Sequence, residues 1–199
     1  MTDASYSRIL DAATAGEDEK ASRATVGSYR EHLTRLFVLD PVEAWIPVFS
    51  RLARLTKAPK HHLVDPALAA RMVDVGETGL LRGDGQYVVG ATDTWLGAPF
   101  ESLATQSVRV YADAARAQTG HLRTETGREI DLVEGDERQV VAIEVKLAGT
   151  VSGHAVRHLH WLGDQLGDRL VDKVVITTGE HAYRRPDGVA VVLLARLGP

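Results

Sequence analysis

The chain has 199 residues, of which 44% are hydrophobic, and its formal net charge is −4. That much apolar material can bury a core in one large domain or two small ones. No apolar run approaches the roughly 20 residues of a membrane span, and acids near the N-terminus do not fit a signal peptide. The absence of cysteine excludes disulfides, thiolate zinc sites and cysteine nucleophiles. We therefore expect a cytoplasmic globular protein with no membrane partner, in which any metal ligand is oxygen or histidine.

The charge is unevenly distributed along the chain. Residues 22–64 carry a local net charge of +4, so the remainder is close to −8. A basic stretch on an acidic protein is typical of a phosphate-binding surface. The residues predicted to contact nucleic acid in this stretch are Arg51, Arg54, Lys57 and Lys60. A solvated helix face or loop is the alternative interpretation.

The first half of the chain shows the order of a winged helix. Residues 1–21 are expected to form an N-terminal extension without an assigned function. A helix should start after Ser22 as its cap, followed by a short apolar segment, a basic loop and a strand near residues 61–64. Asp65 and Pro66 then predict the start of another helix, with Leu68, Met72 and Val73 facing inward. Residues 22–75 are therefore predicted to be a small winged-helix-like region.

A change of pattern separates the two halves. Residues 76–95 are rich in glycine and are interpreted as a linker. Beyond it, a long helix opening near Pro99 is expected to precede three strands, a helix at 152–166 and a strand at 173–178, with a last strand at 189–194. The sequence therefore predicts an α/β domain over residues 96–199 with a helix, three strands, helix, strand core.

The most informative stretch is the hairpin expected over residues 127–147. Its alternation places Asp131, Glu144 and Lys146 on one face and apolar residues on the other. With the turn centred on Asp136 and Glu137, Asp131 should lie opposite Ala142, and Glu144 should lie one diagonal step away. Two carboxylates and a lysine are thereby expected to meet.

Such a trio suits a divalent cation beside a phosphate, because Mg2+ prefers oxygen ligands and a lysine can steady charge on the phosphate. Glu101, in the first turn of the long helix, could point toward the same place. Two simpler interpretations stay open. An exposed face of an amphipathic hairpin shows the same alternation, and a glutamate in a first turn is favourable to the helix dipole alone.

Three separated motifs resemble a known family. Phe100-Glu101, the run from Arg123 to Val133, and Ile143-Glu-Val-Lys146 are similar to the C-terminal domain of unknown function found in bacterial and archaeal AAA-type ATP-binding proteins. That domain is similar in turn to the PD-(D/E)XK nuclease superfamily, whose core has the same order of elements. The resemblance covers about residues 22–199, since Thr25–Tyr29 and Pro59–Asp65 also look like the winged-helix-like half of that family.

The resemblance implies a restriction-endonuclease-like core with a metal-dependent site. It implies Glu101, Asp131 and Glu144 as ligands of Mg2+ or Mn2+, and Asp131, Glu144 and Lys146 as catalytic residues. It also places Arg123 near the site, where it would contact nucleic acid. The implied activity is that of a metal-dependent DNA phosphodiesterase, an endonuclease of the hydrolase class.

Two alternatives remain at the level of sequence. No GxxxxGK[ST] stretch occurs, so the chain is not expected to hydrolyse ATP through a P-loop on its own. It could be a catalytically inactive module that binds nucleic acid or protein, or a remnant of a larger ATPase that works with a partner. The expected partners are therefore DNA, a separate ATPase chain or further copies of the same chain.

Overall fold

The structure is a computed structural model that describes residues 22–47, 55, 58–72, 74–82, 96–136 and 138–198. Three residues predicted to contact nucleic acid, Arg51, Arg54 and Lys57, lie outside the described residues, as do the proposed extension at 1–21 and most of the proposed linker. The described part is a mixed α/β structure with two sheets.

The elements of the structure follow a simple order along the chain. The helices are α2 (Arg23–Arg35), α3 (Pro66–Met72), α4 (Glu77–Arg82), α5 (Gly97–Ala114) and α6 (Arg157–Leu166). The strands are β1 (Leu39–Val42), β2 (Lys60–Leu63), β3 (Gln118–Arg123), β4 (Glu129–Gly135), β5 (Val140–Lys146), β6 (Leu170–Thr177), β7 (Tyr183–Arg184) and β8 (Ala190–Leu193). The predicted order of helix, three strands, helix and strand is confirmed from α5 to β6. Of the helices described, none is long and apolar enough to cross a bilayer.

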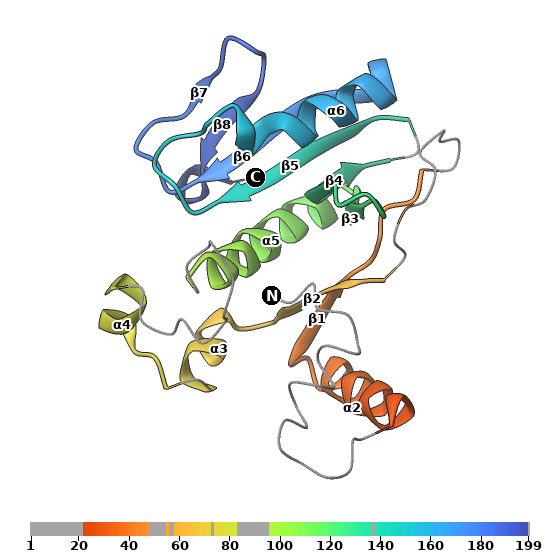
Figure 1. The fold of residues 1–199 in the computed structure, drawn as a ribbon, viewed down its shortest axis with the longest axis vertical. Helices are drawn as coiled ribbons and strands as arrows, with labels where there is room; N and C mark the ends of the chain where they lie inside the picture. The colour runs from red at the N-terminus through yellow and green to blue at the C-terminus, as the bar shows by residue number, and fades with distance from the viewer. Residues whose placement is uncertain are drawn as a thin grey trace.

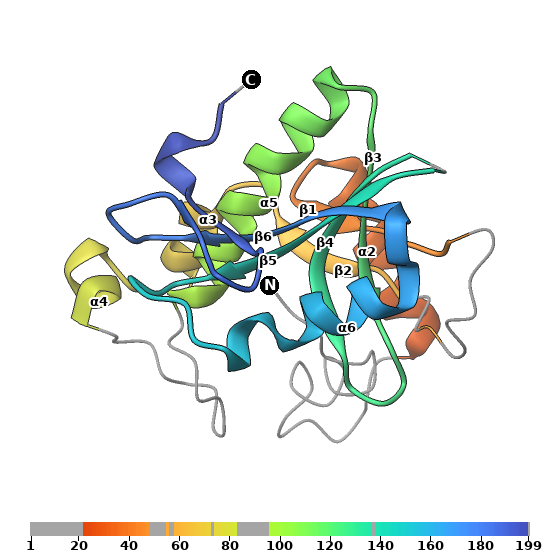
Figure 2. The same ribbon diagram turned by 90° about the horizontal axis from the view of Figure 1, so that it is seen from above.

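The larger sheet has the strand order β3-β4-β5-β6-β8-β7. Strands β3, β4 and β5 are antiparallel neighbours, whereas β5, β6 and β8 run parallel to one another. The parallel step from β5 to β6 needs a crossover, and α6 supplies it. Helix α5 lies on one face of this sheet and α6 on the other (Figures 1 and 2).

Apolar side chains fill both faces of the central strands. Toward α6, Leu159 and Leu162 pack with a cluster that includes Val133 and Ala142 of the hairpin. Toward α5, a second cluster contains Ala104, Val108, Leu132, Ile143, Val145 and Ile176. Each buried branched side chain contributes roughly 1.5–3 kcal/mol. Strands β4 and β5 are therefore central and covered on both faces, and the interpretation of an exposed amphipathic hairpin is wrong.

The register of the hairpin differs from the prediction by two residues. Ala142 pairs with Val133, and the pairing runs from Gly135 with Val140 to Leu132 with Ile143. The loop is longer than predicted, because Asp136 Oδ1 accepts the backbone N–H groups of residues 138 and 139 at 2.7 and 2.8 Å. Side chains alternate with a period of two, so this shift preserves the faces. Asp131 and Glu144 consequently remain together.

The smaller sheet pairs β1 with β2 in antiparallel register. Two helix starts agree with the sequence: Ser22 Oγ accepts the Thr25 N–H at 3.1 Å, and Asp65 Oδ1 accepts the Ala67 N–H at 2.9 Å. The inward orientation predicted for α3 is wrong at Leu68 and Met72, which are exposed, and Val73 lies outside the described residues. Short helices on a small sheet cover little surface, so apolar spacing alone does not bury a side chain there.

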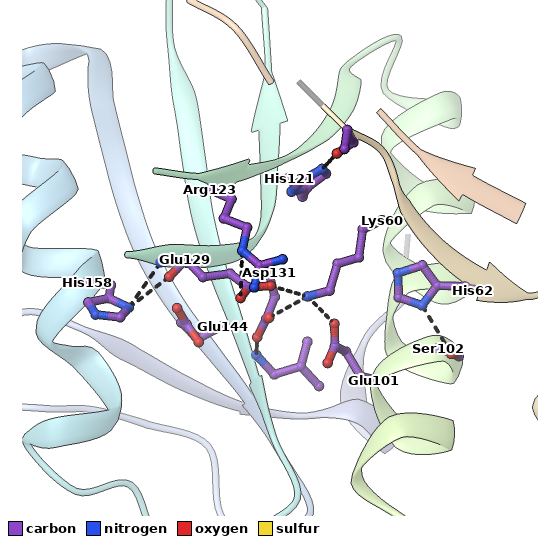
Figure 3. Close-up of polar contacts among 12 residues, drawn as sticks. Lys60, His62, Glu101, Ser102, His121, Arg123, Glu129, Asp131, Glu144 and His158 are labelled. Carbon is purple, nitrogen blue, oxygen red and sulfur yellow. Dashed lines mark hydrogen bonds and ion pairs between the residues drawn. The ribbon is translucent and has the colours of Figure 1, made fainter. Parts of the chain in front are cut away.

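Polar contacts fix the β1-β2 hairpin to the larger sheet and to α5. His62 Nδ1 lies 3.1 Å from Ser102 Oγ on α5, and Arg109 forms an ion pair with Asp40 of β1. The segment after β1 runs beside β3, where the His121 carbonyl accepts the Trp45 N–H at 2.7 Å. These contacts bring β2 over the N-terminal end of β4, where the candidate site lies (Figure 3).

Candidate functional site

Four carboxylates lie together near the start of β4 and the end of β5. Glu101 comes from the first half of α5, Glu129 and Asp131 from the start of β4, and Glu144 from the end of β5. Glu101, Asp131 and Glu144 are buried, with exposed fractions of 9%, 7% and 4%. The structure thus brings together the three carboxylates that were predicted as metal ligands, and it adds Glu129 to them.

Lys60 of β2 lies among these carboxylates (Figure 3). Its Nζ is 2.6 Å from Glu101 Oε1, 2.9 Å from Asp131 Oδ1 and 3.0 Å from Glu129 Oε1. Burial alone would lower the pKa of Lys60, but the charges of Asp131, Glu101 and Glu129 raise it well above its ordinary value. The ammonium is therefore a permanent positive charge at the centre of the site.

This position differs from the role that the sequence suggested for Lys60. It was grouped with the basic residues expected to contact nucleic acid, yet its exposed fraction is 3%. Burial alternates along β2, since Lys60 and His62 are buried while His61 and Leu63 are less so, but its sequence KHHL has no apolar alternation that would predict this. A lysine on the inward face of a strand requires buried acidic partners, and those partners lie in the other half of the chain.

Asp131 is the best-satisfied of the four acids. Its Oδ2 accepts the Val145 backbone N–H at 2.9 Å, and its Oδ1 contacts Lys60. Burial would raise the pKa of Asp131, but the Lys60 ammonium, followed by Lys146 and the backbone N–H, holds it well below its usual value. Asp131 is consequently ionised, and it connects β4, β5 and β2.

Glu144 and Lys146 form the second part of the site. Lys146 Nζ lies 3.0 Å from Glu144 Oε2 and 3.9 Å from Asp131 Oδ2. Burial and then the neighbouring charge of Asp131 raise the pKa of Glu144 well above its ordinary value. Burial would lower the pKa of Lys146, but Asp131 and Glu144 raise it. A carboxyl whose pKa is raised thus lies next to one whose pKa is lowered, with a lysine beside both.

The pKa of Glu101 is raised, as that of Glu144 is. Burial and the charge of Asp131 raise the pKa of Glu101 to about 7, although Lys60 opposes the shift. Two of the buried acids, Glu101 and Glu144, therefore favour the neutral form more than ordinary glutamates do. The centre carries less negative charge than its four carboxyl groups would suggest.

Basic side chains lie next to Glu129, at the start of β4. Arg123 Nε lies 4.0 Å from Glu129 Oε2, so the arginine predicted from the resemblance is adjacent to the acids. His158 of α6 has Nδ1 at 2.9 Å from the Glu129 carbonyl, and its Nε2 accepts the Arg157 Nε–H at 2.9 Å. Both nitrogens of this imidazole are thereby engaged with protein groups. Sequence reasoning did not connect Arg157 and His158 with the site, because the approach of α6 to β4 is a tertiary contact.

The described side chains do not fit a divalent cation between Glu101, Asp131 and Glu144. The Lys60 ammonium is already in contact with two of these carboxylates. Within the described ranges, no group of three or more His, Asp and Glu side chains has an arrangement that could hold a metal ion. The Mg2+ or Mn2+ suggested by the resemblance therefore lacks a matching set of ligands among these residues.

Comparison with known families covers both halves of the chain. Residues 96–197 match the family described as Domain of unknown function (DUF4143). The chain belongs to the DUF4143 family. This domain is found in AAA-ATPase-associated proteins, in line with that part of the sequence resemblance. Residues 2–79 match a second family, Domain of unknown function (DUF8612).

No curated protein and no solved structure matches this DUF4143 chain. The two family matches nonetheless divide the site. Glu101, Asp131 and Glu144 lie within the DUF4143 match, whereas Lys60 lies within the DUF8612 match. The catalytic and binding roles assigned to these residues from the sequence stay predictions.

Proposed function

We propose that this DUF4143 chain is a nucleic-acid-binding module with a nuclease-like core. The basic rim, defined as Arg123, Arg128, Lys146 and Arg157, would bind the sugar–phosphate backbone. The observation that carries the proposal is the position of this rim beside a carboxylate centre that already contains its own ammonium group. The order of α5, β3, β4, β5, α6 and β6 supports the nuclease-like core.

Three members of the basic rim are tied to the acids by direct contacts: Arg123 to Glu129, Lys146 to Glu144, and Arg157 through His158 to the Glu129 carbonyl. After burial, the positive charges of Arg157, Arg128 and Lys146 are the causes that lower the pKa of His158. Arg128 and Arg157 are exposed, and the Arg128 guanidinium stacks over the Trp161 ring at 4.6 Å. A stacked guanidinium keeps a fixed orientation and can donate two hydrogen bonds to one phosphate.

The acidic centre does not oppose this binding as strongly as four free carboxylates would. Lys60 and Lys146 contact the carboxylates directly. The raised pKa values of Glu101 and Glu144 further reduce the negative charge near neutral pH. A phosphate at the basic rim would therefore meet net attraction from the arginines.

Binding to labelled duplex and single-stranded DNA, measured by fluorescence anisotropy across a salt series, tests the proposal. Replacing both Arg128 and Arg157 with Ala should weaken binding regardless of sequence, and should reduce the slope of log K against log salt by about 2. The matched control is Arg138→Ala with Arg184→Ala, which removes the same charge from exposed residues outside the basic rim. Equal losses in the two double variants, or no wild-type binding at low salt, would refute it.

Metal-dependent phosphodiester hydrolysis of DNA is a second proposal, and it would require bound DNA to supply part of the metal coordination, because the Lys60 ammonium lies between Glu101 and Asp131. The observation that favours it is the close approach of Lys146 to both Glu144 and Asp131, which matches the trio expected from the sequence. Incubation of plasmid and linear DNA with wild type, Asp131→Ala and Lys146→Ala in Mg2+ or Mn2+ tests this activity. Cleavage by wild type that both variants lose would support this activity. If wild type does not cleave DNA, nucleic-acid binding remains as the proposed function.

A further inference from the structure

Lys60 joins two regions of the chain that match different families. It belongs to β2, inside the part that matches DUF8612, whereas Glu101, Glu129 and Asp131 belong to the part that matches DUF4143. Without β2 these three acids would face one another with no cation from their own region in contact with all of them. The site is therefore complete only when both regions pack together.

Three carboxylates contact the Lys60 ammonium. An ammonium has three N–H donors and no acceptor. Nζ lies within 3.0 Å of three different carboxylate oxygens, one each from Glu101, Glu129 and Asp131. Nζ donates a hydrogen bond to Asp131 Oδ1, and the Glu101 and Glu129 oxygens are ion-pair contacts, so the buried charge has three acidic partners.

The backbone that carries Lys60 is fixed on both sides. Lys60 pairs with Val42 in the β1-β2 ladder, and His62, two residues later, contacts Ser102 of α5. Beyond β1, the His121 N–H donates to the Glu43 carbonyl at 3.0 Å. The backbone at Lys60 is therefore fixed by strand pairing and by the contacts of its neighbours, and this fixes the position of the ammonium.

We infer that the Lys60 ammonium is the resident cation of this site and takes the position that a divalent metal ion would need. Mg2+ requires oxygen ligands at about 2.0–2.1 Å in near-octahedral geometry, so it cannot share Glu101 and Asp131 with an ammonium in contact with both. Two cations at such separations would also repel each other strongly in a buried site. The intact chain consequently holds no metal ion at Glu101 and Asp131. This inference goes beyond nucleic-acid binding, which depends on the basic rim.

Mn2+ binding to wild type and to Lys60→Ala tests the inference without any need for enzymatic activity. Loss of the free Mn2+ electron paramagnetic resonance signal reports binding, and the melting temperature reports its effect on the fold. Wild type should show no Mn2+ binding that depends on Asp131. Lys60→Ala should bind Mn2+, and its melting temperature should rise by about 5–10 °C at 100 times the dissociation constant. Adding Asp131→Asn to Lys60→Ala should abolish both effects.

Two further variants keep the test decisive. Lys60→Arg retains a cation and should behave like wild type toward Mn2+. If Lys60→Ala does not fold, Lys60→Gln keeps a hydrogen-bonding side chain without the charge and takes its place. A folded, uncharged variant at position 60 that binds no Mn2+ would overturn the inference. So would wild-type Mn2+ binding that Asp131→Asn removes.

Discussion

Asp131 Oδ1 lies 2.9 Å from Lys60 Nζ, although the two residues are 71 positions apart in the chain. The same aspartate accepts the Val145 N–H through its other oxygen. One carboxylate thereby holds together the N-terminal hairpin and two strands of the larger sheet. The stability of the site should depend on this pair more than on any exposed ion pair.

Replacing Lys60 with Ala should lower the free energy of unfolding by about 3–5 kcal/mol in metal-free buffer, because it leaves buried carboxylates without their cation. Urea denaturation measures this change. The control is Arg35→Ala, which breaks the ion pair with Glu31 on α2, where both side chains are largely exposed. The control should cost about 0.5 kcal/mol or less. Similar losses in the two variants would show that Lys60 is not a buried structural cation.

Replacing Asp131 and replacing Glu144 should have different effects on the free energy of unfolding. Asp131→Asn should lower the free energy of unfolding at pH 8, since it weakens the contact that keeps Lys60 satisfied. Glu144→Gln should leave it unchanged or raise it, because the raised pKa of Glu144 means that its ionised form is unfavourable in the fold. Chemical denaturation of both variants at the same pH makes the comparison. Losses of equal size would contradict the difference in electrostatic environment.

The stability that Asp131 contributes should depend on pH. Its folded-state pKa is lowered, so the stability it provides is present above its unfolded pKa and is lost as the pH falls through the folded value. The stability difference between wild type and Asp131→Asn should therefore shrink only in strongly acidic solution. A difference that vanished near pH 6 would not fit this assignment.

Glu134 lies outside the candidate site, and its ionisation should lower the free energy of unfolding as the pH rises. Its Oε2 accepts a hydrogen bond from Thr119 at 3.0 Å, while burial raises its pKa to about 7. The folded state then binds more protons than the unfolded state between about pH 4.5 and 7, so stability falls as the pH rises through that window. Glu134→Gln should remove this loss and be more stable than wild type by up to about 3 kcal/mol at pH 8.

Denaturation of Glu134→Gln and wild type at pH 4.5 and pH 8 checks this prediction, and the difference should be small at the lower pH. Glu180→Gln removes the same charge from an exposed side chain and serves as the control. A stability gain for Glu134→Gln that is equal at the two pH values would count against titration of Glu134 as its cause.

Close packing at Gly120 should also contribute to the stability of the fold. An added Cβ there would lie 2.8 Å from the Trp45 Cβ, so Gly120→Ala must push the segment after β1 away from β3. We expect a loss of about 1–3 kcal/mol. Gly27→Ala on α2 meets nothing within 4 Å and should be neutral or gain up to about 1 kcal/mol. Thermal unfolding of the two variants compares them, and an unaffected Gly120→Ala would mean that the segment can move without cost.

Local pattern was sufficient for much of the fold. The alternation in β4 and β5 placed Asp131 and Glu144 together, and the helix in front of them was predicted from its apolar spacing. The two-residue error in register did not separate these side chains, because faces repeat every second residue. The side-chain caps at Ser22 and Asp65 were predictable for the same reason, since a cap depends on residues within one turn.

The tertiary structure alone decided what lies between the acids. Lys60 is remote from Asp131 in sequence, and neither hydrophobic periodicity nor charge counting shows that β2 crosses the start of β4. Charge counting assigned Lys60 to the surface, because an isolated lysine is rarely buried. Burial becomes favourable only when several carboxylates supply contacts at once, and that condition depends on the packing of three separate elements.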